Sequence, residues 1–313
     1  MSAIEVLEPG LFTTVQDLGR EGFGAMGVSA SGAADALSLR VGNKLLGNAE
    51  GAAGLEMTLL GGAFRFPEGG LAALTGSDFG AMLDGAAIEI WKPFLARAGQ
   101  VLRVGATRAG ARCYLCVRGG ISVRAFLGSA STHILSGLGG HEGRALKKGD
   151  VLAVGDASAG RGEETLSERA RKMLLPRKAL RVTPGPQRDW FTAAALELFF
   201  ASGYRVTEEA NRMGLRLAGP AVARAAEREL ISEGVALGAV QVPESGMPII
   251  LFVEQQTTGG YPKIANVIAA DFHSLGQLRP RDEVRFASVD WETARALLLE
   301  QEAVMASEEL LFA

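Results

Sequence analysis

The sequence is poor in the residues that carry metal, redox and disulfide chemistry. Its 313 residues include two Cys and three His, and aromatic residues make up 6% of the chain. Two Cys cannot build a disulfide framework in a chain of this length, and so few thiols are typical of a reducing compartment. The shortage of Cys and His argues against a metal centre and against a nucleophile activated by His.

Long apolar runs and an excess of basic charge are also missing. No stretch of about 20 residues lacks both charge and glycine, so the sequence predicts no transmembrane helix. The N-terminus carries Glu5 and Glu8 without a basic and then an apolar segment, and we expect no secretory signal. Lys and Arg number 32 against 35 Asp and Glu, a balance that disfavours binding to nucleic acid. These absences predict a cytoplasmic protein that binds neither membrane nor nucleic acid.

Glycine is the residue that the chain has in excess. It contributes 41 of the 313 residues, which is roughly twice the usual share of about 7%. The glycines follow no three-residue period, which excludes collagen. Frequent glycines are typical of a chain that turns often, as folds with many β-strands do. We therefore predict a mainly β protein with a few short helices.

Residues 1–156 show the strand pattern clearly. Short apolar segments there are bounded by Gly or Asp, as strands commonly are. A helix is expected over 32–46, with Ser31 as its N-cap and Gly47 just beyond its end. The expected strands are 71–76, 87–91, 100–105 and 112–120.

Residues 157–177 interrupt this pattern and mark the predicted domain boundary. They are small and charged and contain few β-branched residues, which is typical of a linker with about one helical turn. Residues 178–313 form the second predicted domain. Its expected helices are 189–201 and 291–306, and its expected strands are 181–187, 248–254, 264–272 and 282–289.

A short pattern is shared between the two predicted domains. Segments 146–154 and 278–286 each contain a basic turn, an Asp and then a strand. One pattern of this length is weak evidence for duplication, but its spacing of about 132 residues suits two similar domains. The apolar stretch Leu297–Leu299 in the last helix is expected to cover a barrel or to meet a partner.

The cysteines, histidines and glycine-rich loops match no familiar catalytic motif. Cys113 and Cys116 lie inside a strand pattern, where positions three apart point to opposite faces, so we expect two buried small residues rather than a metal site. His133, His141 and His273 have no partner at metal-ligand spacing and are expected to be structural or surface residues. The sequence also lacks the phosphate-binding glycine motifs, so we expect any ATP to bind elsewhere.

Two polar, glycine-rich clusters remain. Residues 15–35 place several hydrogen-bonding side chains among glycines, either as a helix cap and long turn or as a functional loop. Residues 254–263 combine neutral amides and hydroxyls with a phenol and a Lys. Such groups suit an uncharged amide or ureido ligand. A polar hairpin tip explains the second cluster equally well.

These two clusters also carry a resemblance to a known family. The sequence resembles the KipA or allophanate hydrolase subunit 2 family, which includes the C subunit of 5-oxoprolinase and biotin-dependent carboxyltransferases. The resemblance covers almost the whole chain, and nine motifs occur in order. They are 14–35, 43–48, 55–62, 114–121 and 127–132 in the first half, and 185–191, 211–220, 231–251 and 256–268 in the second.

The resemblance implies two cyclophilin-like β-barrel halves, at 1–156 and 178–313, joined by the linker at 157–177. It also implies a KipI-like partner subunit. In one branch of the family, a further subunit of the LamB/YcsF type joins them in a complex that opens 5-oxoproline to glutamate with ATP, and this chain would be inactive alone. In another branch, fused relatives form the carboxyltransferase part of urea carboxylase and pass CO₂ from carboxybiotin to urea.

Three functions therefore stay open. The first is the 5-oxoprolinase subunit. The second is a carboxyltransferase component, which would need a separate biotin carrier because the chain lacks an A/V-M-K-M biotinylation sequence. The third is a regulatory protein that sequesters a KipI-like kinase inhibitor. The chain departs from the family at Glu254, where Asp is usual, and at Pro280-Arg281-Asp282, where a P-G-D turn is usual.

The resemblance implies a set of substrate-binding residues but assigns no catalytic one. Arg20, Arg212 and Lys263 are expected to hold a carboxylate, a phosphate or the oxyanion of carboxybiotin, and Gln256 and Thr257 to orient an amide. The full set is Arg20, Ser31, Asp35, Arg118, Asn211, Arg212, Gln241, Glu254, Gln256, Thr257, Tyr261 and Lys263.

Overall fold

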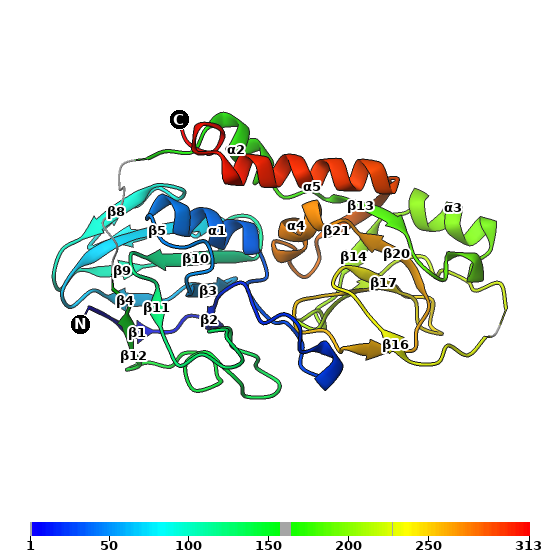
Figure 1. Cartoon of the computed structure of the whole chain (residues 1–313), viewed down its shortest axis with the longest axis horizontal. Coiled ribbons are helices and arrows are strands. Elements are labelled where there is room, and N and C mark those ends of the chain that lie inside the picture. Colours follow the sequence, from blue (N-terminus) through cyan, green and yellow to red (C-terminus); the bar gives the residue numbers. More distant parts are fainter. Residues whose placement is uncertain (1, 157–163, 227) are drawn as a thin grey trace. The chain divides into compact units, whose positions relative to one another are not determined.

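The computed structural model describes residues 2–156, 164–226 and 228–313 (Figure 1). The chain forms two compact units. The first unit comprises Met1–Arg20, Ser31–Leu174 and Val304–Ala313, and the second comprises Glu21–Ala30 and Leu175–Ala303. The fold is mainly β, with 31% strand and 19% helix, which confirms the predicted fold class.

The first unit contains two antiparallel sheets. The order of the larger sheet is β11 (Ile121–Ser122), β12 (Val151–Val154), β1 (Ala3–Glu8), β4 (Ala63–Arg65), β9 (Val101–Arg103), β6 (Met82–Leu83) and β7 (Ala86–Ala87). The order of the smaller sheet is β2 (Thr13–Gln16), β3 (Gly54–Thr58), β10 (Arg112–Val117), β5 (Gly70–Gly76) and β8 (Pro93–Ala96).

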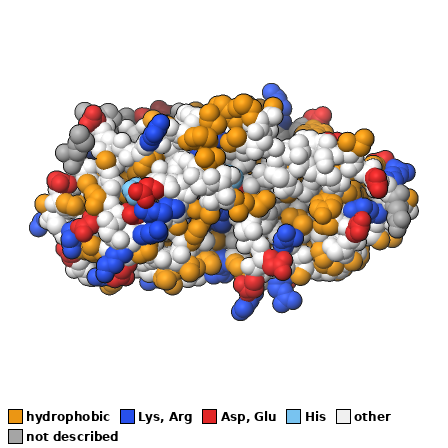
Figure 2. Space-filling view, turned by 90° about the horizontal axis from the view of Figure 1, so that it is seen from below, with side chains coloured by type: hydrophobic (Ala, Val, Ile, Leu, Met, Phe, Trp, Pro, Cys, Tyr) orange, Lys and Arg blue, Asp and Glu red, His pale blue; other side chains and the backbone are white. Residues whose placement is uncertain are grey.

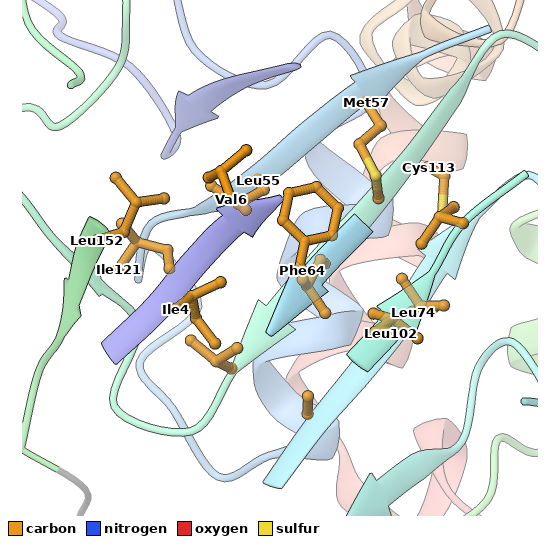
Figure 3. Packing of buried hydrophobic residues seen from close by; sticks show 14 of the residues in the cluster. Ile4, Val6, Leu55, Met57, Phe64, Leu74, Leu102, Cys113, Ile121 and Leu152 are labelled. Atoms are coloured by element: carbon orange, nitrogen blue, oxygen red, sulfur yellow. The ribbon is translucent and has the colours of Figure 1, made fainter. Parts of the chain in front are cut away.

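Strand β10 is buried on both faces, because its side chains alternate between two apolar clusters. Cys113 and Leu115 join the cluster that Figure 3 shows from close by, together with Phe64 of β4. Tyr114 and Cys116 join a second cluster on the opposite face. The two thiols therefore point to opposite faces of the sheet, as predicted, and burial raises the pKa of both.

Helix α1 (Ala36–Leu45) packs on β5 and β10 (Figure 1). The prediction that Ser31 caps this helix is wrong. The carboxylate of Asp35 accepts a hydrogen bond from the Ser38 N–H at 2.9 Å and is the N-cap. Gly47 follows the helix in the left-handed conformation, with φ of 68°, as predicted. The second apolar cluster also takes in α2 (Glu168–Met173) and α6 (Glu308–Leu311).

The second unit is built around a closed barrel of seven strands. The barrel closes where β13 and β21 pair in parallel, and every other neighbouring pair is antiparallel. The order is β13 (Ala179–Pro184), β20 (Lys263–Val267), β17 (Ala239–Gln241), β18 (Ile249–Leu251), β15 (Gly214–Ala218), β14 (Tyr204–Val206) and β21 (Glu283–Ser288).

Short elements complete the second unit. Helix α3 packs on β21, where the rings of Phe199 and Phe286 stack with centroids 4.4 Å apart. A separate two-stranded ribbon joins β16 (Glu233–Gly234) to β19 (Thr258–Gly259). The helices are α3 (Ala193–Ala201), α4 (Phe272–Gly276) and α5 (Trp291–Ala306), and the 3₁₀ turns are η1 (Gly24–Met26), η2 (Arg188–Trp190) and η3 (Ala269–Asp271).

Most predicted elements are present, but three have different bounds. The strand expected at 87–91 is wrong beyond Ala87, because Trp91 takes a left-handed conformation (φ 64°) that turns the chain into β8. The strand expected at 264–272 ends at Val267, and η3 and α4 follow. The helix expected at 189–201 begins at Ala193, because the Thr192 hydroxyl caps it.

The linker and membrane predictions meet the structure only in part. Residues 157–163 of the expected linker lie outside the described residues, and 168–173 form α2, which Ser167 caps. The position of the domain boundary stays a prediction. Within the parts of the chain that the structure describes, no helix has the length and apolar character needed to cross a membrane.

The turns before β12 and β21 share the local geometry that their sequences suggested. Asp150 accepts a hydrogen bond from the Lys147 N–H at 2.7 Å, and Asp282 accepts one from the Arg279 N–H at 2.9 Å. Gly149 precedes the first Asp with φ of 91°. Arg281 occupies the matching position with φ of 74°, so this departure from the family places a side chain where glycine is preferred.

Asp150 also lies in an ion-pair network in the first unit. Two nitrogens of Arg144 donate to its carboxylate, at 2.8 and 2.9 Å. The Arg144 guanidinium lowers the pKa of Asp150 from its ordinary value of 3.8 to about 2. The side chain is 11% exposed, so water screens the pair only weakly.

The variant Asp150→Asn is expected to lower the free energy of unfolding by about 2 kcal/mol at neutral pH. A carboxyl group whose pKa falls on folding stabilises the fold above its unfolded pKa, and this contribution is lost as the pH falls through the folded value. The difference between the wild-type chain and the variant should therefore shrink between about pH 4 and about pH 2. Urea unfolding curves across this range measure it. A difference that does not change with pH would show that the ion pair is not its source.

Candidate functional site

The second unit contains a pocket of about 620 Å³ at one side of the barrel. Strands β15, β17 and β18 contribute to its wall. Four of the residues predicted to bind substrate line it, namely Asn211, Gln241, Gln256 and Tyr261. The other lining residues are Thr207, Glu208, Glu209, Met213, Gly214, Arg216, Leu217, Ala218, Pro243, Ser245, Met247, Pro248, Ile249 and Leu251.

Gln241 is the pocket residue with unused hydrogen-bonding capacity. Its side chain is buried, and its Oε1 accepts a long hydrogen bond of 3.4 Å from Nε2 of Gln256. Its own Nε2 has no acceptor among the described residues. A buried amide donor without an acceptor is rare in folded proteins because it loses its hydration without replacement. The pocket therefore offers a donor that suits the oxygen of a bound amide.

Gly259 of the ribbon allows this arrangement. A Cβ atom at this position would lie 2.7 Å from Nε2 of Gln241 and 3.4 Å from Nε2 of Gln256. Only glycine lets the ribbon backbone approach the two amides so closely. The side chain of Gln255 fixes the same region, because its Nε2 donates to the Val235 carbonyl at 3.2 Å. Thr257 contributes through its backbone, since its carbonyl accepts from the Val235 N–H at 3.2 Å.

Lys263 lies beside Gln241, since the two residues are register partners on β20 and β17. The Lys263 side chain is 4% exposed, and its ammonium forms an ion pair with Glu233 of the ribbon. Gln187 joins the two, because its Oε1 accepts from the Lys263 N–H at 3.1 Å and its Nε2 donates to Glu233 at 2.8 Å. These contacts, that of Lys263 foremost, lower the pKa of Glu233 below its usual range.

Arg212 and Glu254 form a second buried ion pair. Both side chains are buried, and Nε of Arg212 donates to the Glu254 carboxylate. The Glu254 N–H also donates to the Arg212 carbonyl at 2.8 Å. The pair joins the turn before β15 to the turn after β18. In the same turn, Oδ1 of Asn211 accepts from the Met213 N–H at 2.8 Å. The structure thus places Arg212 and Glu254 next to the pocket residues in sequence but not among the residues that line the pocket.

The remaining four predicted residues belong to the first unit. Arg20 donates to the Ser131 carbonyl and packs on the ring of Phe126. The Ser31 hydroxyl donates to the Thr132 carbonyl at 2.9 Å. The remaining two contact α1 and its end: Asp35 caps the helix, and Nε of Arg118 donates to the Leu46 carbonyl at 3.1 Å.

Asp17 organises this part of the first unit and was absent from the predicted set. Its carboxylate accepts hydrogen bonds from the Gly19 N–H, the Ala130 N–H and the hydroxyls of Ser129 and Ser131, at distances from 2.5 to 2.8 Å. It therefore fixes the loop around Arg20 to the segment that Arg20 and Ser31 contact. Asp17 and its partners all fall within motifs of the family resemblance, and that was the available signal.

Charge is spread over the surface rather than gathered at one site. On the face that Figure 2 shows, Lys and Arg side chains lie among Asp and Glu side chains. Among the described residues, no group of three or more His, Cys, Asp or Glu is arranged to hold a metal ion. His133 and His273 are both buried.

Comparisons with known proteins agree on one family. Residues 26–288 match the family described as carboxyltransferase domain, subdomain A and B. The chain is 40% identical over 291 residues to the C subunit of 5-oxoprolinase from Escherichia coli, with 93% of each chain covered. It is 36% identical over 294 residues to the protein of the same name in Haemophilus influenzae, with 94% of each covered.

A solved structure extends the similarity to a larger enzyme. The crystal structure of urea carboxylase from Kluyveromyces lactis matches with a TM-score of 0.89 and 32% sequence identity. The match covers 99% of this chain and 30% of that enzyme. The chain is thus similar to two kinds of protein that act on small amides or ureas by name, one of its own length and one much longer.

Proposed function

The chain belongs to the family of carboxyltransferase domains with subdomains A and B, and from this membership we propose that it is the C subunit of a 5-oxoprolinase. The observation that carries the proposal is the 40% identity to a protein of that name over 93% of both chains. The reaction adds water across the lactam bond of 5-oxoproline, with the oxygen going to the carbonyl carbon and a proton to the ring nitrogen. The product is glutamate, and a second water cleaves ATP to ADP and phosphate.

The pocket in the second unit suits a small lactam. A ring amide has one acceptor, its carbonyl oxygen, and one donor, its N–H. The Nε2 group of Gln241 is placed to donate to the oxygen, and Asn211 and Gln256 bring further neutral amides to the same pocket. Neutral groups hold a neutral amide without the cost of burying an unpaired charge. These residues are proposed to bind and orient the substrate.

The chain is proposed to work with two partners and to be inactive alone. Relatives that are named as one lettered subunit imply further subunits, and we take these to be a KipI-like protein and a LamB/YcsF-type protein. ATP is proposed to bind to a partner. Reconstitution tests this directly: ATP hydrolysis that depends on 5-oxoproline should require this chain together with both partners. Full activity of the two partners without this chain would refute the proposal.

A second candidate is the carboxyltransferase component of a urea or amide carboxylase. The match to urea carboxylase over 99% of this chain favours it. Carboxybiotin, when bound, supplies the carboxyl group that is transferred. The polar pocket residues fit its ureido ring, and Lys263 provides a buried cation near them for the carboxylate. Because the carrier would be a separate protein, transfer of labelled CO₂ from a carboxylated biotin carrier to urea distinguishes this candidate from the first.

A further inference from the structure

The β16–β19 ribbon brings a carboxylate to a lysine that is otherwise enclosed. The Lys263 side chain is 4% exposed, whereas that of its partner Glu233 is 43% exposed. A buried ammonium group requires a counter-ion, because an unpaired charge in a protein interior is strongly unfavourable. Glu233 meets this requirement from a segment at the surface. The buried and the exposed member of the pair therefore belong to different elements.

The element that carries Glu233 is small and is separate from the barrel sheet. The ribbon consists of two paired residues on each strand, Glu233 with Gly259 and Gly234 with Thr258. Figure 1 shows β16 apart from the barrel strands β17 and β20. Two residue pairs make a weak sheet by themselves. An anion that binds Lys263 can thus replace Glu233 without disturbing the barrel that holds the lysine.

The position of the ion pair relates it to the neutral pocket. Lys263 and Gln241 are register partners on neighbouring strands, and the unused Nε2 donor belongs to Gln241. Gln187 adds an amide that already donates to a carboxylate, that of Glu233, at 2.8 Å. The barrel thus places a carboxylate-binding pair next to an amide-binding donor. 5-Oxoproline carries both of the corresponding groups, a ring amide and a carboxylate.

We infer that Lys263 and Gln187 form a subsite for the carboxylate of the substrate, and that Glu233 occupies this subsite until the substrate displaces it. This inference rests on the proposed function and adds a role for Glu233, which the sequence did not single out. It assigns the ligand to the class of small cyclic amides that carry a carboxylate. Neutral cyclic amides would use the pocket beside Gln241 but would gain nothing from Lys263.

The test compares two ring amides that differ in charge. Titration calorimetry of the full chain should be carried out with 5-oxoproline, which is anionic, and with 2-pyrrolidinone, which is neutral. In Glu233→Gln, a neutral amide replaces the competing carboxylate at Lys263. We expect 5-oxoproline to bind about five-fold or more tightly than to the wild-type chain, and 2-pyrrolidinone to bind equally to both.

Two further variants make the result decisive. Glu197→Gln makes the same change of charge on the exposed surface of α3 and should leave both affinities unaltered. Glu233→Ala removes the same carboxylate and should also tighten binding of 5-oxoproline, which covers the case in which the glutamine side chain of the first variant disturbs the ribbon. Circular dichroism confirms that each variant is folded.

The outcomes separate this inference from the proposed function. Unchanged or weaker binding of 5-oxoproline by both Glu233 variants would overturn it, as would an equal change for the two ligands or no binding by any variant. If the reconstituted complex forms glutamate while the variants show no preference for the anion, the subsite is wrong and the function stands. If the complex is inactive while the variants prefer the anion, the subsite stands and the function falls.

Discussion

Replacing Gln241 with Leu is expected to lower kcat/KM of the reconstituted complex for 5-oxoproline about 100-fold. The variant removes the Nε2 donor proposed to bind the lactam oxygen, and it also removes the acceptor that Gln256 now uses. A substrate group left unpaired in a site built to bind it costs about 2–3 kcal/mol. Leu has nearly the same volume as Gln, so the barrel should keep its packing.

Steady-state kinetics with 5-oxoproline as the varied substrate measure this effect. Gln301→Leu is the matched control, since it makes the same substitution in the same unit on α5, where Nε2 donates to the Ala270 carbonyl. The control should keep the wild-type kcat/KM. A Gln241→Leu complex whose kcat/KM stays within a factor of about three of wild type would place the amide site elsewhere.

Replacing Arg212 with Met is expected to lower the free energy of unfolding of the second unit by about 3–5 kcal/mol. Arg212 and Glu254 are each less than one-tenth exposed and bonded to each other. The single variant leaves the Glu254 carboxylate buried without its guanidinium, which is far more costly than losing the pair as a whole. Urea unfolding of the isolated chain, followed by circular dichroism, measures the change.

The double variant Arg212→Met with Glu254→Leu separates pairing from packing. Because it removes both charges, it should recover most of the stability that the single variant loses. A double variant as unstable as Arg212→Met would show that the loss comes from packing rather than from an unpaired charge. It would then also be unnecessary to invoke the longer side chain of Glu254, in place of the usual Asp, to explain the contact.

The parts of the fold that follow from local pattern were predicted well. The apolar run at 112–120 predicts β10, and its alternation predicts opposite directions for Cys113 and Cys116. The last helix begins and ends as expected because it is long and strongly apolar along its length. Local competition explains the errors. Ser31 and Asp35 are both good N-cap residues, and only the position of Ser38 selects Asp35.

Long-range pairing was beyond the reach of the sequence pattern. Nothing in the residues of β13 and β21 indicates that they pair in parallel and close the barrel, because they are about 100 residues apart. The assignment of Glu21–Ala30 to the second unit is of the same kind. Such contacts depend on the whole chain, whereas propensity and periodicity describe only neighbours.

The candidate site shows the same division. The neutral amides of 254–263 suggested an amide ligand, and the structure gathers Gln241, Gln256 and Tyr261 at one pocket. Glu233 was missed because its role depends on the ribbon that brings it to Lys263, 30 residues away. No spacing rule links an acid on one short strand to a lysine on another, so only the fold reveals the pair.

The most direct test of the account is the formation of glutamate from 5-oxoproline by the complete complex. The KipI-like and LamB/YcsF-type proteins are mixed with ATP and either the wild-type chain, the Gln241→Leu chain or no chain. The account predicts that glutamate and ADP appear together with the wild-type chain, about 100-fold more slowly with Gln241→Leu, and not at all without the chain. Glutamate formed at the full rate by the two partner proteins alone would contradict it.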